Sequence, residues 1–205
     1  MKYVSYLALC FHSALVFLSI YGDARGSLIF DNFNGPREGG STSANGGVGE
    51  EIVTDRDITL TNISAYNRMT ESGQIIFLIW NAADHTKLFQ TSAMQFGPDA
   101  GTAYTWKMST DFTFTLHTGV HYVIGSNVDV SHDDAYDSVP ESQNGITSEM
   151  VLWSVSGFPA TSVRPFIGGA DSAIRLYGVP EPSTLILAAL GGLTLLAMRR
   201  KRTSP

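Results

Sequence analysis

The chain has 205 residues and a formal net charge of −6, and it contains one cysteine, Cys10. Residues 25–179 hold 8 Lys and Arg against 17 Asp and Glu, a formal charge of −9. An acidic body of this kind argues against nucleic acid as a partner and against adhesion to anionic lipid. Because Cys10 lies in the N-terminal segment, we expect the rest of the chain to contain neither a disulfide nor a reactive thiol.

The N-terminal segment is typical of an export signal. Lys2 and the α-amino group give it a weakly positive start, and an apolar run extends from Leu7 to Ile20. Gly22-Asp23-Ala24 places small residues at the −3 and −1 positions, so cleavage is predicted after Ala24, with residues 1–24 as the signal peptide. Cleavage two residues later and an uncleaved membrane anchor are the alternatives.

The following residues predict β-strands throughout. Residues 34–49, which are rich in Gly, Ser and Asn, are expected to form a loop after a first strand. Residues 73–81 contain an uninterrupted apolar run, which predicts a central strand covered on both faces. Residues 57–67 alternate, with Ile58, Leu60, Asn62 and Ser64 expected on one face and Thr59, Thr61, Ile63 and Ala65 on the other.

Strand patterns continue in the second half of the body. Phe112, Phe114 and Leu116 alternate with threonines, so their side chains are expected to face the core. Thr118-Gly119 is expected to turn the chain back into the next strand. Strands recur about every ten to fifteen residues with turns between them, which predicts an all-β fold with one jelly-roll-like β-sandwich over residues 25–178. The predicted strands are 27–33, 57–67, 73–81, 87–91, 102–108, 111–117, 120–125, 147–155 and 173–179.

The C-terminal part of the chain combines three features. Val179-Pro180-Glu181-Pro182-Ser183 comes first, and its prolines favour an extended backbone because proline has a fixed φ and no N–H donor. The apolar run 185–198 follows, and as a helix it would be about 21 Å long against a hydrocarbon core of roughly 30 Å. A basic tail, which can snorkel and remains cytoplasmic, completes the pattern of a transmembrane helix. The tail consists of Arg199, Arg200, Lys201 and Arg202.

This order of Pro-Glu-Pro triplet, short apolar helix and basic cluster resembles the PEP-CTERM sorting signal of Gram-negative bacteria, here over residues 179–205. The resemblance implies recognition by an exosortase-type processing enzyme near the triplet. It also implies transient anchoring to the membrane through the C-terminal helix, followed by a location at the cell surface or outside the cell. A buried core helix and a GPI signal are the alternative interpretations of the apolar run.

A second resemblance concerns the body. Its strand order includes Phe30-Asp31-Asn32, Leu60-Thr61-Asn62-Ile63, the run 73–81 and, later, the run 114–125. This order is similar to the choice-of-anchor ectodomains of bacterial surface proteins. The similarity implies a fold and leaves the activity open.

One acidic cluster is a candidate metal site. Asp129, Asp133, Asp134 and Asp137 are expected on a loop, and oxygen ligands at close spacing suit Ca²⁺. The spacing differs from that of an EF-hand, which needs glycine at the sixth position and glutamate at the twelfth. A solvated acidic loop without a cofactor is the favoured interpretation, and Ca²⁺ binding is the alternative.

Two other groups of residues could bind a ligand. His117 and His121 flank the Thr118-Gly119 turn without forming a direct cross-strand pair, so surface histidines are favoured over a zinc site. Trp80 is expected in the core. Trp106 and Trp153 have polar neighbours, so exposed rings that stack on sugars are the alternative there, and core or half-buried positions are the favoured interpretation.

The sequence contains no motif of a known catalytic type. It lacks Gly-x-Ser-x-Gly, His-Glu-x-x-His and a phosphate-binding glycine loop, so we do not expect an enzyme. The favoured function is that of an exported structural or adhesive protein in an exopolysaccharide-associated layer. A carbohydrate- or calcium-binding module is the first alternative, and a secreted hydrolase is the second.

Overall fold

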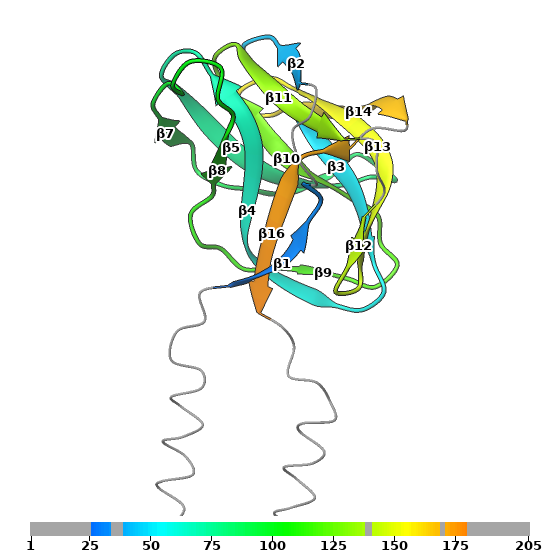
Figure 1. The fold of residues 1–205 in the computed structure, drawn as a ribbon. Helices are drawn as coiled ribbons and strands as arrows, with labels where there is room; N and C mark the ends of the chain where they lie inside the picture. Colours follow the sequence, from blue (N-terminus) through cyan, green and yellow to red (C-terminus); the bar gives the residue numbers. More distant parts are fainter. Residues whose placement is uncertain (1–25, 34–38, 138–140, 169–170, 180–205) are drawn as a thin grey trace, which may run out of the picture.

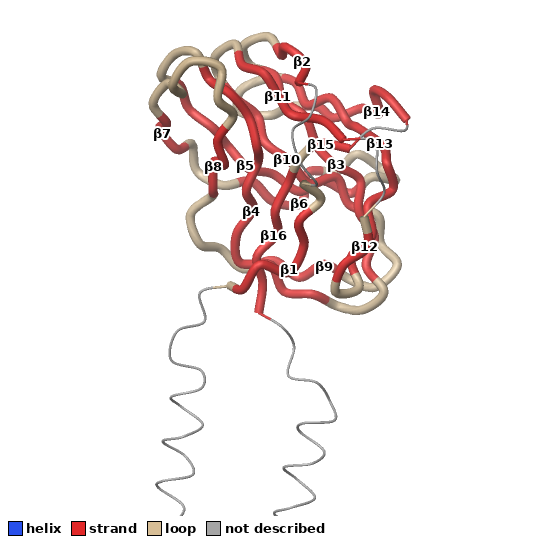
Figure 2. The backbone as a smooth tube through the Cα atoms, viewed as in Figure 1, coloured by secondary structure: helices blue, strands red, loops and turns tan. Residues whose placement is uncertain are grey.

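The protein forms two antiparallel β-sheets that pack face to face (Figures 1 and 2). The structure, a computed structural model, describes residues 26–33, 39–137, 141–168 and 171–179, and these residues contain strands and no helix. The predicted all-β, two-sheet fold is therefore confirmed for this part of the chain. The predicted C-terminal helix at 185–198 lies outside the described residues. Within the described residues, no helix is long and apolar enough to cross a membrane.

The first sheet has the order β1-β16-β4-β11-β15. Three short strands extend it, because β2 pairs with β11 while β8 and β9 pair with β4. The bounds are β1 (Ser27–Asp31), β2 (Gly39–Thr42), β4 (Ile58–Met69), β8 (Thr105–Met108), β9 (Phe114–Leu116), β11 (His132–Asp137), β15 (Asp171–Ser172) and β16 (Ile174–Val179).

The second sheet has the order β12-β13-β3-β10-β5-β6. Here β14 pairs with β13, and β7 pairs with β5. The bounds are β3 (Gly46–Thr54), β5 (Gly73–Asn81), β6 (Lys87–Gln90), β7 (Met94–Phe96), β10 (Tyr122–Val128), β12 (Ser142–Gln143), β13 (Ile146–Ser156) and β14 (Ser162–Gly168).

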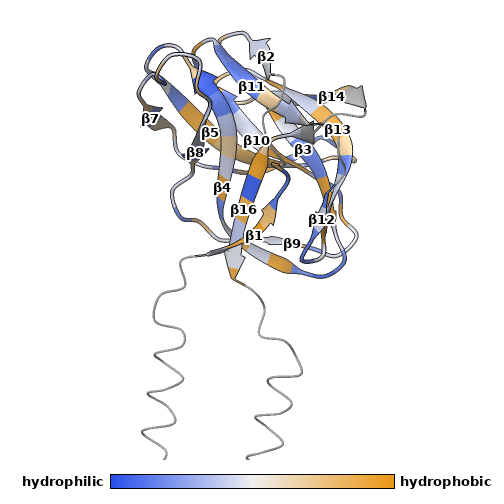
Figure 3. Ribbon diagram, in the orientation of Figure 1, coloured by the Kyte–Doolittle hydropathy of each residue, from blue (hydrophilic) through white to orange (hydrophobic). Residues whose placement is uncertain are grey.

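The main core lies between the sheets and follows the period-two alternation of the strands. In β16, buried Ile174 and Leu176 alternate with half-buried Arg175 and Tyr177, which gives the alternating bands visible along this strand in Figure 3. Burying such a side chain contributes about 1.5–3 kcal/mol. The largest fully buried side chains are Phe30, Ile52, Leu60, Ile63, Met69, Ile75, Ile76, Phe77, Leu78, Ile79, Leu116 and Ile124.

Strand β5 is covered on both faces, as its apolar run predicts. Phe77 points into the main core, whereas Leu78 and Trp80 point to a second apolar cluster on the other side of the same sheet. The turn at residues 157–160 packs on this second cluster, and Ala160 in the turn is 1% exposed. The carbonyl of Ala160 accepts a hydrogen bond from Lys87 Nζ at 2.9 Å.

Two of the predicted core phenylalanines are only partly buried. Leu116 is completely buried on β9, but Phe112 and Phe114 are half-buried and pack on the margin of the core. They contact Phe89 of the edge strand β6, with ring centroids 4.5 and 6.1 Å away. Phe112 and Phe114 therefore face the core, as predicted, but they are not enclosed between the two sheets, because the segment passes the side of the sandwich.

The alternation predicted for residues 57–67 changes phase at a β-bulge. Leu60 pairs with Gly178 and Asn62 pairs with Tyr177, so Thr61 is the additional residue. Before the bulge Ile58 and Leu60 share one face, as predicted, and this face points into the core. After it the inward residues are Ile63, Ala65 and Met69, so the predicted face holding Asn62 and Ser64 was wrong.

The segment predicted as a loop at 34–49 contains strand structure in its described part. Strand β2 begins at Gly39 and β3 at Gly46, and β3 is a central strand of the second sheet. Thr118-Gly119 does form a turn, with Gly119 at φ +69°, but it does not close a hairpin. It carries the chain from β9 in the first sheet to β10 in the second.

Candidate functional site

Strands β1 and β16 bring the two ends of the described chain to one end of the sandwich (Figure 1). Ser27 lies opposite Gly178, and its Oγ donates a hydrogen bond to the Gly178 carbonyl at 3.3 Å. On its other side β16 pairs with β4, where Val179 lies opposite Thr59. The chain therefore enters and leaves the domain through paired strands, up to and including Val179.

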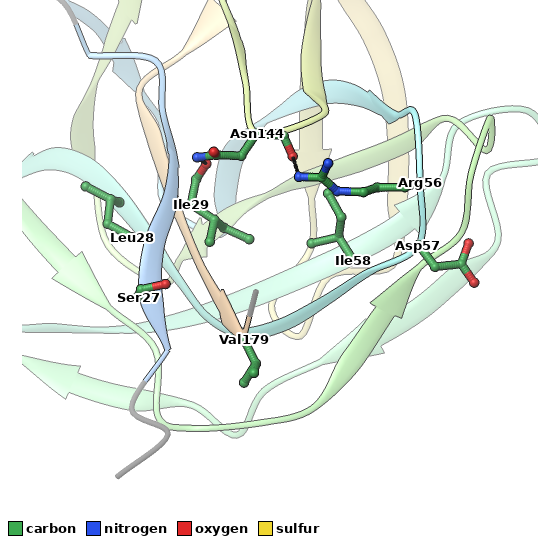
Figure 4. A pocket seen from close by; sticks show the side chains of 8 residues that line it. All are labelled: Ser27, Leu28, Ile29, Arg56, Asp57, Ile58, Asn144 and Val179. Carbon is green, nitrogen blue, oxygen red and sulfur yellow. Dashed lines mark hydrogen bonds between the residues drawn. The ribbon is translucent and has the colours of Figure 1, made fainter. Parts of the chain in front are cut away.

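A pocket of about 220 Å³ opens beside Val179 (Figure 4). Ile29 and Ile58 are its buried apolar residues, whereas Leu28 is 47% exposed. We call this surface the terminal pole. It consists of the residues that line the pocket: Ser27, Leu28, Ile29, Arg56, Asp57, Ile58, Asn144 and Val179.

Arg56 is the cation of the terminal pole, and Asn144 fixes its position. The Asn144 carbonyl accepts a hydrogen bond from Arg56 Nη2 at 2.7 Å, while Asn144 Nδ2 donates to the carbonyl of Ile29 at 2.8 Å (Figure 4). Asn144 has φ +51°, in the left-handed region that asparagine tolerates better than most residues. The turn before β13 thus holds a guanidinium group at the rim of the pocket.

Asp57 is the anion of the terminal pole. Its carboxylate accepts hydrogen bonds from the Thr118 backbone N–H at 2.9 Å and from Thr118 Oγ1 at 3.3 Å, and it lies 3.0 Å from His117 Nδ1. The Thr118 N–H and the neighbouring His117 keep the pKa of Asp57 below its usual value. Arg56 and Asp57 together leave the terminal pole with no excess of either charge.

The predicted sorting residues lie at this end of the chain. Val179 is the last residue that the structure describes, and it ends β16. Pro180, Glu181, Pro182 and Ser183 lie outside the described residues, as does the basic tail 199–202.

A second group of side chains covers part of the outer face of the first sheet. Tyr66 of β4 is at its centre, with its ring centroid 4.7 Å from that of Phe33, 4.9 Å from that of Trp106 and 5.7 Å from that of Tyr104. All four rings are half-buried. With two arginines they form what we call the aromatic–arginine row: Phe33, Tyr66, Arg68, Tyr104, Trp106 and Arg175.

Arg175 occupies one face of the Trp106 ring. Its guanidinium carbon is 4.0 Å from the ring centroid, a cation–π contact, and its Nε donates to Asp31 Oδ2 at 2.9 Å. Tyr66 lies against the same indole at an interplanar angle of 35°. Because protein groups already stack on Trp106, a sugar would meet the margin of the row and not the broad face of this indole.

Arg68 ends the row on the side of Tyr104. Its guanidinium carbon is 6.0 Å from the Tyr104 ring centroid, and its Nη2 forms a close ion pair with Asp133. Burial and the charge of Asp133 raise the pKa of Tyr104, so its hydroxyl stays protonated. The sequence analysis did not predict that these residues lie together, because they come from separate strands and loops. The aromatic spacing at Tyr104 and Trp106 is the signal that could have indicated it.

The acidic cluster predicted as a loop is largely a strand. β11 includes Asp133 and Asp134, and its alternation sends them to opposite faces. Asp133 pairs with Arg68 on the outer face, whereas Asp134 is buried. Asp129 lies before the strand and accepts a hydrogen bond from the Gln74 N–H at 2.6 Å.

These carboxylates do not converge on a common point in the part of the chain that the structure describes. No group of three His, Cys, Asp or Glu side chains there could hold a metal ion. The side chain of Asp137 lies outside the described part. The expectation that the cluster forms a loop was therefore wrong, because pairing of β11 with β2 and β4 makes it a strand.

Asp134 instead forms a buried pair with His132. His132 Nε2 lies 3.0 Å from Asp134 Oδ2, and both side chains are nearly inaccessible to solvent. Thr42 Oγ1 donates to the same carboxylate oxygen at 2.8 Å, and His132 Nδ1 is 3.1 Å from the Val130 carbonyl. Burial alone would lower the pKa of His132, but the charge and close contact of Asp134 and the hydrogen bond to the Val130 carbonyl outweigh it and raise that pKa.

The two histidines around the Thr118-Gly119 turn belong to different sheets. His117 follows β9 and faces Asp57, whereas His121 precedes β10 and has its Nδ1 3.0 Å from Glu51 Oε1. Each is thus oriented by its own carboxylate. Both are exposed, as predicted for surface histidines. The hairpin expected at this turn is absent, because the turn connects two sheets.

The three tryptophans differ in their surroundings. Trp80 is 4% exposed, as predicted for a core residue. Trp153 is 5% exposed, and its Nε1 donates to Glu51 Oε2 at 2.9 Å, so it offers no open face to a sugar. Trp106 alone of the three is half-buried.

Comparison with known proteins identifies the segment that follows the terminal pole. Residues 178–202 match the family described as the PEP-CTERM protein-sorting motif, which exosortase recognises. No curated protein and no solved structure matches the chain. The matched range starts at Gly178, one residue before the end of β16. The protein therefore carries a PEP-CTERM sorting motif, which marks it as an exported protein.

Proposed function

We propose that this protein is a structural or adhesive component of an exopolysaccharide-associated outer layer, without enzymatic activity of its own. The observation that carries the proposal is the continuity between β16 and the sorting motif, which shares Gly178 and Val179 with the strand. The described two-sheet body is thus the cargo of the sorting motif. The similarity of this body to choice-of-anchor ectodomains, expected from its strand order, belongs to the same proposal.

The ionic groups of the body support a structural role. Lys107 and Asp99 form an almost inaccessible ion pair at 2.7 Å, and Arg68 and Arg175 are paired with Asp133 and with Asp31. These charges are used within the fold, where they link strands to one another and to adjoining loops. Such pairs suit a rigid scaffold better than a reactive cleft.

Cell fractionation tests the proposal. Producing cells are separated into cytoplasm, membranes and extracellular polymer, and the body is quantified by its tryptic peptide 57–68. We expect this peptide in the polymer fraction, and the intact mass there should lack Arg199 to Arg202. Recovery of full-length chain in membranes or cytoplasm at steady state would exclude the proposed location.

A carbohydrate-binding role is the second candidate, and the aromatic–arginine row favours it. Aromatic edges and guanidinium groups together offer apolar and hydrogen-bonding contacts to a polysaccharide. The arginines are paired with aspartates and the body is acidic, so a neutral glycan fits better than an anionic one.

A glycan array tests this second candidate. Tyr104→Ala is expected to reduce binding, whereas Phe166→Ala, which removes a 60% exposed ring on β14, should leave it unchanged. Repeating the array with EDTA examines the calcium alternative at the same time. Equal binding by both variants would exclude the row as the binding surface. The hydrolase alternative stays a prediction, which activity screening on polysaccharides would test.

A further inference from the structure

The sorting motif follows the folded domain without a spacer. Val179 is paired with Thr59 in the sheet, and Pro180 is the next residue. A residue of extended chain spans at most about 3.6 Å, so Glu181 lies within roughly 7 Å of Val179 and Pro182 within roughly 11 Å. An enzyme whose active site encloses the triplet therefore reaches the surface around Val179.

From this constraint we infer that the terminal pole is a contact surface for the exosortase-type processing enzyme. The inference rests on the sorting part of the proposed function and extends it to a surface of the folded domain. It concerns Leu28 and Arg56 above all, because both are exposed beside Val179.

The shape and polarity of the terminal pole suit contact with a protein. Its pocket has an apolar base at Ile29 and Ile58, with exposed Leu28 beside it. Protein interfaces typically place an apolar side chain of one partner in such a pocket, surrounded by polar groups. The pole has Arg56 and Asp57 in equal number, so it lacks the cluster of cations that attracts anionic lipid headgroups.

Local unpairing of β16 would give the enzyme more room, but the packing at Gly178 opposes it. A Cβ atom placed on Gly178 would lie 2.5 Å from the Thr59 carbonyl oxygen and 2.7 Å from Ile29 Cδ1, so the backbones are in close contact. Separating this end of β16 would also break its pairing with β1 and expose Ile29. Approach of the enzyme to the intact pole avoids both losses.

The test measures processing of the full chain in producing cells. Leu28→Ser is compared with Leu88→Ser, a matched control because Leu88 is 42% exposed on β6 and lies outside the pocket lining. Each variant is made with the native junction and with twelve Gly/Ser residues inserted between Val179 and Pro180. Such an insert has a root-mean-square length of about 17–21 Å, which separates the triplet from the pole. The readout is the rate at which the tail 199–202 is lost.

With the native junction, we expect Leu28→Ser to slow processing about fivefold and Leu88→Ser to leave it unchanged. With the insert, both variants should be processed like the insert-only chain. The inference would be overturned if Leu28→Ser, without the insert, lost its tail at the same rate as the unsubstituted chain. Slowing that persists with the insert would also overturn it, because it would indicate defective folding or export. If even the unsubstituted chain keeps its tail, the proposed sorting function is wrong. This outcome is distinguishable from failure of the inference about the terminal pole, in which the unsubstituted chain is processed.

Crosslinking provides an independent measurement. A photoreactive amino acid at position 28 is expected to form an adduct with the processing enzyme, and one at position 88 is not. Adducts from position 28 to lipid alone would show that the membrane, and not the enzyme, covers the terminal pole.

Discussion

The phenyl ring of Phe77 occupies the middle of the main core, where it is fully buried on β5. Replacing it with alanine leaves a cavity between the two sheets, so Phe77→Ala should lower the free energy of unfolding by about 3–5 kcal/mol. Urea unfolding of the purified protein measures this loss. Leu88→Ala is the control, with an expected loss within about 0.5 kcal/mol, since Leu88 is 42% exposed. A loss below about 1 kcal/mol for Phe77→Ala would contradict the assigned core.

The buried pair of His132 and Asp134 predicts a pH dependence of stability. The pKa of His132 is raised in the folded protein, whereas in the unfolded chain it is about 6.5. The pair therefore contributes its full stabilisation below about pH 6.5, and the contribution is lost as the pH rises through the folded pKa. Nearby Asp133 acts in the same direction as Asp134.

Urea midpoints measured between pH 5.5 and pH 9 should therefore contain a fall toward high pH that comes from His132. This component should be absent in His132→Gln, which removes the titratable imidazole of the buried pair. Identical pH profiles for the two proteins would mean that the buried pair does not titrate in this range.

At the scale of single residues, the sequence indicated the core better than the ligand sites. The run around Phe77 predicted burial on both faces, because hydrophobicity alone decides that outcome. The aspartates at 133 and 134 were candidates for one shared Ca²⁺ site, as the alternative to a solvated acidic loop. Once β11 is paired on both edges, however, neighbouring residues must point to opposite faces, and that pairing depends on partners far away in sequence.

At the scale of elements, β3 shows why a central strand can escape prediction. Its sequence starts Gly46-Gly47-Val48-Gly49, which is typical of a loop. The glycines have a packing reason, because β3 and β10 lie close together. A Cβ atom on Gly125 would be 2.1 Å from the Val48 carbonyl oxygen, and one on Gly47 would be 2.0 Å from that of Ser126.

Gly125→Ala should therefore destabilise the protein by about 1–3 kcal/mol, the usual cost of overpacking, because backbone atoms must move. Gly97→Ala is the matched control. An added Cβ there meets nothing within 4 Å, so the expected change lies between zero and a gain of about 1 kcal/mol. Thermal or urea unfolding of both variants decides the matter, and equal stabilities would refute the close approach of β3 and β10.

The bulge in β4 limits prediction in a different way. Simple alternation placed Ile58 and Leu60 on the same face, but it could not locate the additional residue Thr61. The bulge depends on register with β16, which lies more than a hundred residues later. The local pattern therefore predicted that the strand exists. The orientation of the side chains in its second half depends on the pairing with β16 and could not be predicted locally.

At the scale of the molecule, the composition and spacing of strands were enough to predict two packed sheets. The order of strands was not predictable, because every sheet joins strands that are distant in sequence, such as β1 with β16 and β3 with β10. The close position of the two ends at the terminal pole follows from the first of these pairs. This proximity of the two ends could not be predicted from the sequences of the end segments alone.

The position of β16 predicts how the protein tolerates cutting near its sorting motif. β16 lies between β1 and β4, and buried Ile174 and Leu176 belong to the main core. A chain that ends at Val179 keeps all of these contacts, so it should unfold at the same urea midpoint as the chain with residues 180–205. A chain that ends at Ala173 loses the central pairing of the first sheet and should show no cooperative unfolding. Circular dichroism in urea distinguishes the two truncations. If the chain ending at Val179 were markedly less stable, processing near Pro180 would release a weakened domain, and the terminal pole could not be the natural boundary between the domain and its sorting signal.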